Sequence, residues 1–558
     1  MNLKHVATAL AMSLALAGCS TTTASTTDAN NSSSTSSDTS TAITKVSAKV
    51  SAGTLVGFNY DGVNTFRGVP YATAERFQSP KAVESYEGGT YMALTFGAVA
   101  PQDRTLSATA SINDAEFMTP SNGTADMVGN EQCQYLNVWS NDMSGSKPVV
   151  VFIHGGGLSN GSSSELSYYD GANFAKTEDT VFVSVNHRLN YLGFLDVSEY
   201  GGEEYANSGN VGLEDVVEAL KWVHENIEQF GGDPSNVTII GQSGGGLKVT
   251  TLACMSDTAD LFQKVVVWSG GISSVENTKE NAEAETKKLV DYLKLKDDEV
   301  IDTLTSMSYE ELYNACTEAG VSYTTSWGTG TYETAMFDED GNMNEYAKAR
   351  TWLIGSTYSE FSSNGMLVVG VEDNTCNLEM SDEDARTSLE EKYGDSTDAI
   401  IEAFQEAYPN KKLCELLYLN TMSGTSGLSR SYIIDQDNGV LKLLNDNDAT
   451  VYNYVSDYTS PYFGGITMHH TGDIAYWFNN IDKIDYQVVG DKDNAQKAAT
   501  AMADALAAFA KSGDPSTDSL KWEPYTADAH NTMILNQASE QKTDFDTELY
   551  NLIAKAQQ

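Results

Sequence analysis

A serine framed by glycines is the residue of this sequence best placed for chemistry. Ser243 lies in the G-x-S-x-G pattern of residues 241–245, directly after the largely β-branched stretch 236–240. Such a stretch, followed by glycines and then by helix-compatible residues, predicts a strand, a sharp turn and a helix. A turn of this kind holds the serine hydroxyl above the edge of a sheet, as a nucleophile requires. The alternative is a glycine-rich turn with a bystander serine.

A second glycine run supplies the backbone donors that such a nucleophile needs. Three glycines follow His154, directly after the apolar residues 148–153. Amide groups without neighbouring side chains can approach a substrate oxygen closely, as in the HGGG-type oxyanion loop. We therefore expect the N–H groups of Gly156, Gly157 and Gly244 to receive the oxyanion. An ordinary flexible turn is the alternative for this run.

A serine nucleophile also needs a base, and an acid that orients the base. Of the seven histidines, His469 and His470 stand in a glycine-flanked stretch after the apolar residues 451–455, and composition does not choose between them. Loops that follow strands are where catalytic groups gather in such sheets. Glu360 follows the short apolar stretch 352–355 and precedes both histidines, in the order serine, acid, base. Most of the 78 acidic residues are expected on the solvated surface, and Glu360 stands out among them because its segment is otherwise uncharged.

The elements that must position these groups alternate along the chain. Continuous apolar runs at 148–153, 180–185 and 265–267 predict buried strands. Apolar residues recur at helical spacing over 213–230 and predict an amphipathic helix before the strand that leads into Ser243. Further helices are expected at residues 276–315, 381–420 and 495–511, the first two covering the site or packing beside it. This alternation predicts an α/β fold with a mostly parallel twisted sheet flanked by helices.

The N-terminus has the pattern of a targeting segment. Residues 6–17 form an apolar run that is too short to span a bilayer as a mature helix. The run leads into Leu16-Ala17-Gly18-Cys19, which resembles the bacterial lipobox, in which the cysteine is lipidated and becomes the new N-terminus. An ordinary secretory peptide cleaved nearby is the alternative.

The chain is therefore expected to have three parts. These are a signal peptide at 1–18, a disordered Ser/Thr-rich tether at 19–45, and one domain at 46–558. We expect an exported lipoprotein, held on the cell surface or the periplasmic face of a membrane only through an N-terminal lipid anchor on Cys19.

Charge and cysteine content exclude several classes of function. The formal net charge of −45 argues against nucleic acid as a partner, because no basic patch would neutralise phosphates. No cysteine pair has metal-site or redox spacing, so no metal is expected. Export would permit disulfides, but the pairing among Cys133, Cys254, Cys316, Cys376 and Cys414 stays open.

Several motifs together resemble the type-B carboxylesterase family of α/β hydrolases, over about residues 50–540. The matching stretches are residues 66–72, 131–138, 209–215, 230–234 and 510–515. The resemblance implies an α/β-hydrolase fold with helical insertions over the active site, and no cofactor. It identifies Glu360 as the acid of a G-S/T-x-x-x-E segment. It identifies His470, three residues before Asp473, as the base.

Two neighbours of the serine depart from the family pattern. Gln242 and Gly244 stand where family members usually carry Glu and Ala.

Cys133 matches a family disulfide cysteine whose usual upstream partner is missing. No tryptophan occurs between residues 66 and 138, where cholinesterases carry a choline-binding indole, which counts against choline esters.

The resemblance implies a serine carboxylesterase that forms an acyl-enzyme on Ser243. Its substrate would be a small-molecule or polysaccharide-linked ester outside the cell. One alternative is a lipase acting on longer-chain acylglycerols, but no amphipathic lid is identifiable in the sequence. The other is a non-catalytic binding protein, as in neuroligin-like relatives that have lost the serine; here Ser243, Glu360 and His470 are all present. Oligomeric state is not predicted.

Overall fold

The computed structural model describes residues 42–102, 128–364, 378–422, 429–437 and 439–557. The expected signal peptide, the lipidation site Cys19 and Cys376 lie outside these ranges. The first strand begins at Thr44 and pairs antiparallel with the second, so the folded domain starts before the expected residue 46. Thr44 and Lys45 are exposed and polar like a tether, but their backbones pair with Asn59 and Phe58, which composition does not reveal.

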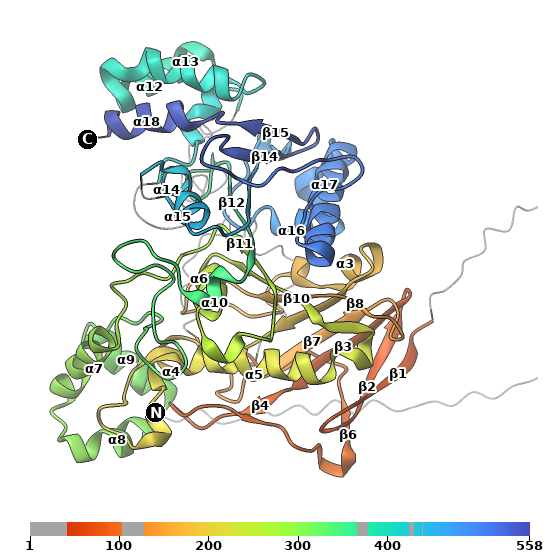
Figure 1. Ribbon diagram of the computed structural model, residues 1–558, viewed down its shortest axis with the longest axis vertical. Helices are drawn as coiled ribbons and strands as arrows, with labels where there is room; N and C mark the ends of the chain where they lie inside the picture. The colour runs from red at the N-terminus through yellow and green to blue at the C-terminus, as the bar shows by residue number, and fades with distance from the viewer. Residues whose placement is uncertain (1–41, 103–127, 365–377, 423–428, 438, 558) are drawn as a thin grey trace, which may run out of the picture. The chain divides into compact units, whose positions relative to one another are not determined.

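A large mixed sheet forms the centre of the folded domain (Figure 1). Its order is β1-β2-β3-β7-β9-β8-β10-β11-β12-β13-β14-β15, and β6 pairs with β2. Every neighbouring pair from β9 through β14 is parallel, whereas the pairs from β1 to β9 along this order, and β14 with β15, are antiparallel. The mostly parallel central sheet expected from the sequence is therefore confirmed.

The strands of this sheet are β1 (Thr44–Val50), β2 (Gly53–Tyr60), β3 (Val63–Pro70), β6 (Thr90–Met92), β7 (Tyr135–Ser140), β8 (Lys147–Ile153), β9 (Val181–Val185), β10 (Gly232–Gln242), β11 (Lys264–Trp268), β12 (Thr351–Thr357), β13 (Val451–Ser456), β14 (Asn531–Leu535) and β15 (Glu540–Thr543). The short strands β4 (Ala72–Thr73) and β5 (Lys81–Ala82) pair separately. The strands expected at 148–153, 180–185 and 265–267 are β8, β9 and β11.

The described α-helices are α3 (Ala172–Thr177), α4 (Asn190–Phe194), α5 (Val211–Asn226), α6 (Gly244–Leu252), α7 (Lys279–Leu293), α8 (Val300–Ser306), α9 (Tyr309–Glu318), α10 (Glu345–Lys348), α12 (Asp382–Tyr393), α13 (Thr397–Ala407), α14 (Arg430–Ile434), α15 (Val440–Asp446), α16 (Ile474–Trp477), α17 (Lys492–Ser512) and α18 (Thr547–Ala556). The helix expected at 213–230 is α5 with a following 3₁₀ turn, and the alanine-rich helix is α17. The helical segment expected at 276–315 contains α7, α8 and most of α9, and α9 packs against α4. The segment expected at 381–420 contains α12 and α13, and α13 packs against α18.

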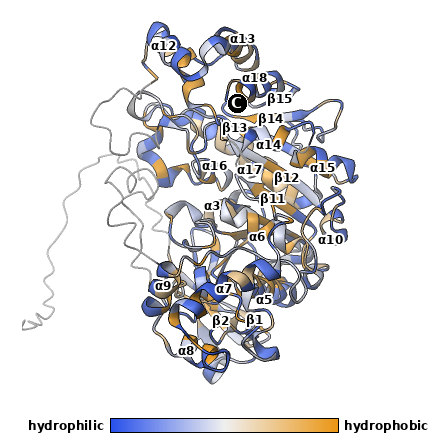
Figure 2. Cartoon of the chain, turned by 90° about the vertical axis from the view of Figure 1, so that its left-hand side faces the viewer, coloured by the Kyte–Doolittle hydropathy of each residue, from blue (hydrophilic) through white to orange (hydrophobic). Residues whose placement is uncertain are grey.

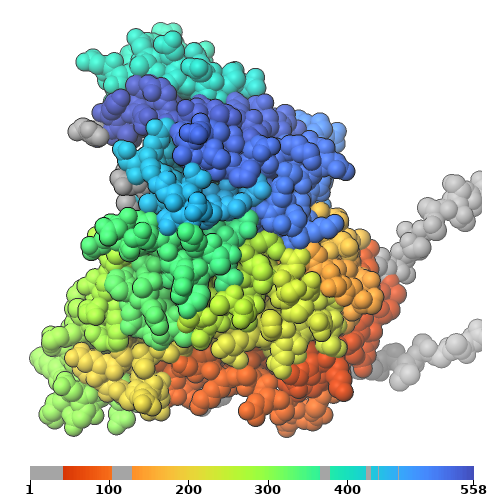
Figure 3. All heavy atoms as spheres, viewed as in Figure 1, coloured from red at the N-terminus to blue at the C-terminus, as the bar shows by residue number. Residues whose placement is uncertain are grey.

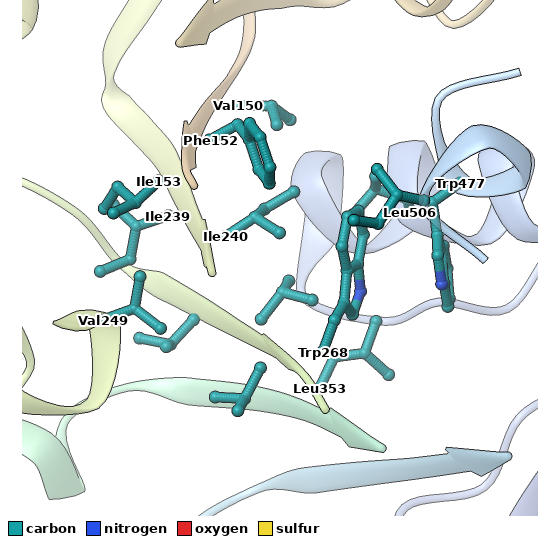
Figure 4. Packing of buried hydrophobic residues seen from close by; sticks show 14 of the residues in the cluster. Val150, Phe152, Ile153, Ile239, Ile240, Val249, Trp268, Leu353, Trp477 and Leu506 are labelled. Carbon is teal, nitrogen blue, oxygen red and sulfur yellow. The ribbon is translucent and has the colours of Figure 1, made fainter. Parts of the chain in front are cut away.

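Helices cover both faces of the sheet with apolar side chains. Helix α6 packs against β10 and β11, and α17 packs against β8 and β10. Figure 4 shows Val249 of α6 and Leu506 of α17 on opposite sides of the strands. Successive strand residues point to opposite faces, so Ile239 turns to α6 and Ile240 to α17. All four side chains are fully buried.

Hydrophobic residues concentrate on the central strands. In Figure 2, β11 and β12 are largely orange, whereas α12 on the outside is largely blue. This distribution is typical of parallel strands that are covered on both faces. In Figure 3 the N-terminal segments, red to yellow, lie together below the blue C-terminal segments. Residues from distant parts of the sequence therefore meet along the parallel strands in the middle of the domain.

Candidate active site

The predicted site residues follow the carboxyl ends of neighbouring parallel strands. The glycine loop follows β8, Ser243 follows β10, Glu360 comes three residues after β12, and His470 lies in the segment after β13. Because β8, β10, β11, β12 and β13 are adjacent and parallel, these ends meet at one edge of the sheet. Ligands of open α/β sheets bind beyond this edge.

Ser243 occupies the sharp turn that its glycines predict. Its backbone has φ 58° and ψ −122°, a conformation that residues with a side chain rarely adopt. Its N–H donates to the Trp268 carbonyl at 2.9 Å, which ties the turn to the end of β11. A Cβ on Gly241 would lie 2.0 Å from the Gly245 carbonyl oxygen, so only glycine fits before the turn. The serine itself stays partly exposed.

Glu360 and His470 form a buried hydrogen-bonded pair. His470 Nδ1 lies 2.5 Å from Glu360 Oε2, and the two side chains are 4% and 0% exposed. The backbone N–H of His470 also donates to the Glu360 carbonyl at 3.2 Å. Donation from Nδ1 to the carboxylate leaves the lone pair on Nε2, the atom that a general base needs.

Two further residues fix the carboxylate, and sequence reasoning missed both. The hydroxyl of Ser269 donates to Glu360 Oε1 at 2.6 Å, and the Thr357 amide donates to the same oxygen at 2.7 Å. Ser269 directly follows β11 at the same sheet edge, which is the signal that could have found it. Together these donors hold Oε2 toward the imidazole.

Positive φ values recur at this edge. They occur at Ser243 (58°), Ser269 (47°), Glu360 (47°) and Thr471 (70°). A backbone in this conformation costs on the order of 1–3 kcal/mol per residue. It persists where the surrounding structure enforces it, often at functional sites. The strain therefore marks the same edge that the side chains mark.

The structure separates the two histidines that composition could not. His469 is buried, and desolvation together with the neighbouring His470 lowers its pKa to about 3. Burial therefore disfavours the protonated form of His469, which a general base must adopt. His470, and not His469, contacts the Glu360 carboxylate. Asp473, three residues on, accepts hydrogen bonds from Ser456 and Trp477 instead, and burial raises its pKa to about 6.

Gln242 contacts the other end of the imidazole. Its Nε2 lies 3.2 Å from His470 Nε2, and its side chain is fully buried. With Nδ1–H directed to Glu360, His470 Nε2 accepts this hydrogen bond. Within the described part of the chain no hydrogen bond joins the Ser243 hydroxyl to His470. Catalytic hydrogen bonds often tighten only when substrate is bound.

The glycine loop lies directly against the serine turn. Gly156 and Gly157 have φ +81° and +64° and are exposed. A Cβ on Gly244 would lie 2.1 Å from the Gly157 carbonyl oxygen, so the two main chains touch. Gly244 is the first residue of α6, where a helix N–H has no partner within the helix. Gly156 and Gly157 are exposed and Gly244 is partly exposed, so the three residues can face a ligand oxygen next to Ser243.

The described residues offer no alternative centre based on metal or thiol. No group of three His, Cys, Asp or Glu among them could hold a metal ion. The described cysteines Cys133, Cys254, Cys316 and Cys414 are buried and outside disulfides, and burial raises their pKa.

Among the described residues, no helix combines the length and hydropathy that a membrane span requires.

Comparison with known proteins gives a consistent result. The model of the carboxylesterase family matches residues 44–553. The chain is 28% identical over 503 residues to the para-nitrobenzyl esterase of Bacillus subtilis (strain 168), covering 87% of this chain and 93% of that protein. It is 36% identical over 252 residues to the phenmedipham hydrolase of Pseudarthrobacter oxydans, covering 44% and 47%.

Solved structures agree with the sequence relatives. An esterase from anaerobic Clostridium hathewayi, described as able to hydrolyse aliphatic aromatic polyesters, superimposes with a TM-score of 0.80 and 31% identity, covering 92% of this chain and 100% of that one. The α/β-hydrolase fold expected from the sequence is therefore confirmed. The chain belongs to the carboxylesterase family and is a carboxylic-ester hydrolase.

Proposed function

We propose that this esterase acts through an acyl-enzyme on Ser243. The observation that supports this proposal most directly is the buried His470–Glu360 hydrogen bond of 2.5 Å, at the sheet edge where Ser243 lies. His470 Nε2 takes the serine proton as the hydroxyl attacks the ester carbonyl, and Glu360 stabilises the imidazolium. The N–H groups of Gly156, Gly157 and Gly244 receive the oxyanion. His470 then protonates the leaving alcohol and activates the water that releases the acid.

The contact with Gln242 sets a condition on the first step. His470 Nε2 must turn its lone pair from the Gln242 amide to the Ser243 hydroxyl. Both donors come from neighbouring residues of one turn, Gln242 and Ser243. Substrate entry would favour this exchange by removing water from the site.

We propose that the preferred substrates carry an aromatic ring near the scissile bond. Phe361 is 42% exposed, and its ring centroid lies 4.2 Å from that of His470. An aromatic group on the substrate would gain a further contact there. The relative from Clostridium hathewayi, described as acting on aliphatic aromatic polyesters, supports the same class.

We propose from the sequence that the protein is exported. Export and lipidation at Cys19 would hold the domain on the cell surface or the periplasmic face of a membrane. At the cell surface, hydroxycinnamoyl esters of polysaccharides are one available aromatic class. Metabolic labelling with an alkyne-tagged palmitate tests this anchor. The label should appear on the exported wild type and be lost in Cys19→Ala. Persistent labelling of Cys19→Ala would reject it.

Kinetics test the substrate proposal. The expected result is a higher kcat/KM for methyl hydroxycinnamates and aryl esters than for aliphatic esters of equal chain length. Phe361→Ala should lower the aromatic preference by about 2- to 13-fold, on the basis of about 0.5–1.5 kcal/mol per aromatic pair. Tyr60→Ala, an exposed aromatic on β2, is the matched control. An unchanged preference in Phe361→Ala would exclude Phe361 as the reason, and a preference for emulsified long-chain esters would identify a lipase.

A further inference from the structure

A fully buried lysine lies beneath the oxyanion loop, and the proposed reaction does not use it. Lys248 is 0% exposed. Its Nζ donates to the main-chain carbonyl of His154 at 3.1 Å, which is its only hydrogen bond among the described residues. His154 is the residue that enters the glycine run. The lysine therefore contacts the segment that carries Gly156 and Gly157.

The helix directs this side chain toward the site. Lys248 is four residues after Gly244 on α6, so both lie on one face of the helix, one turn apart. Side chains of a helix point toward its N-terminus, which here is the serine turn. The side chain thus runs back toward the serine turn, and its ammonium group reaches the His154 carbonyl at the start of the glycine run.

A second hydrogen bond continues the support along the loop. His154 Nδ1 lies 3.0 Å from the Gly155 carbonyl oxygen and donates to it. That carbonyl belongs to the peptide whose N–H is on Gly156. The ring of His154 in turn stacks on His187, with centroids 4.9 Å apart. Two successive carbonyls before the oxyanion amides are therefore held, one by Lys248 and one by the His154 ring.

Stability alone does not explain a lysine at this position. Burying an ammonium costs several kcal/mol unless strong partners compensate. A positive charge in the first turns of a helix also opposes the helix dipole. No described carboxylate forms an ion pair with Nζ, and Glu165 acts on it only through space. An apolar side chain would fill the same volume at lower cost.

We propose that Lys248 is a positioning residue of the oxyanion hole, whose ammonium anchors the glycine loop through His154 and adds positive charge beneath the tetrahedral oxyanion. The proposal rests on Ser243 as nucleophile and on the oxyanion role of the glycine amides. In this proposal Lys248 stabilises the negatively charged transition state and does not strengthen binding of the neutral ester.

The surrounding groups make this contribution depend on pH. Desolvation lowers the pKa of Lys248 to about 7, and Glu165 opposes that shift. The half-buried Glu165 has its own pKa raised to about 7 by desolvation. His154 and His187 face the lysine as neutral rings, because burial holds their pKa well below the usual value. The ammonium is therefore charged below about pH 7 and loses its charge above it.

Matched substitutions separate the charge from the hydrogen bond. Lys248→Met removes both, and Lys248→Gln keeps an uncharged donor. At pH 6, kcat of Lys248→Met should fall about 10-fold or more with KM within about twofold, because the charge acts on the transition state. Lys248→Gln should recover only part of that loss. Melting temperature should hold or rise in Lys248→Met, because a buried charge is removed.

The ratio of wild-type to Lys248→Met kcat isolates the lysine, since the pH response of His470 cancels. We expect this ratio to be largest below pH 7 and to fall between pH 7 and 9. In a Glu165→Gln background the fall should move to lower pH, because the carboxylate no longer stabilises the ammonium. A trifluoromethyl ketone, which forms an oxyanion-like hemiketal on serine, should lose affinity for the wild type relative to Lys248→Met as the pH rises and the lysine loses its proton.

The outcomes separate the two levels of proposal. An inactive wild type, or one that fails to react with the ketone, would reject the serine mechanism itself. An active wild type with a ratio that is constant from pH 6 to 9, or full rescue by Lys248→Gln, would overturn the proposed role of the charge. A lower melting temperature with unchanged kcat would assign Lys248 a structural role only.

Discussion

Replacing Gly244 with alanine is a sharp test of how the oxyanion site is built. A Cβ at this position would lie 2.1 Å from the Gly157 carbonyl oxygen and 2.4 Å from its carbonyl carbon and Cα. All three are main-chain atoms, so no rotamer change relieves the overlap. Ordinary contact begins at 3.4 Å, so the two segments must separate by about 1.3 Å, the difference between 3.4 and 2.1 Å.

That separation would move Gly157 away from the place where the oxyanion forms. A misplacement of about 1 Å costs on the order of 10²-fold in rate, similar to the loss of one oxyanion donor. We therefore expect kcat of Gly244→Ala to fall about 100-fold with little change in KM. The melting temperature should change little, because Gly157 is exposed and the loop can move outward.

Steady-state kinetics with p-nitrophenyl acetate, together with a crystal structure of the variant, would test this expectation. Gly202→Ala is the matched control, because an added Cβ there meets nothing within 4 Å. The family resemblance alone predicts that Gly244→Ala keeps full activity, because members of the family usually carry Ala at this position. Full activity of Gly244→Ala with an unmoved loop would refute the steric reasoning.

Three further predictions concern the imidazole and its partners. Glu360→Gln should lower kcat by about 10³–10⁴ at unchanged KM, because an amide in place of the carboxylate favours the wrong imidazole tautomer; a loss below tenfold in steady-state kinetics would contradict this role. Gln242→Glu should move the acidic limb of the kcat profile upward by about 1–3 pH units, because a carboxylate favours protonated His470; Gln242→Met is its control, and equal profiles would exclude the contact. His469→Ala should stay active in ester hydrolysis while His470→Ala is inactive, and the reverse result would overturn the assignment.

Local sequence patterns predicted most of the scaffold. Strands such as β8 and β11 are short apolar runs, as expected for strands that are buried on both faces. Helix α5 shows helical periodicity, as expected for a helix that is buried on one face. The turn at Ser243 followed from its glycines. The start of the domain at Thr44 was missed, because its polar residues look like tether and only the pairing with β2 reveals a strand.

The site itself was less accessible from local pattern. Residue type did not separate His469 from His470, and the family resemblance supplied that choice. Glu360 stood out in its uncharged segment, and the resemblance then identified it as the acid. Ser269, Gln242 and Lys248 were not predicted to act, because each contacts a group from a different strand end. Such contacts depend on strand order and register, which a single sequence does not show.

The central claim is that Ser243 is the nucleophile activated by His470. Reaction with a fluorophosphonate probe, followed by peptide mass spectrometry, tests it most directly. We expect one probe per chain, on Ser243, with labelling abolished in Ser243→Ala and strongly slowed in His470→Ala. A folded wild type that hydrolyses esters without labelling, or that labels at another serine, would contradict the claim.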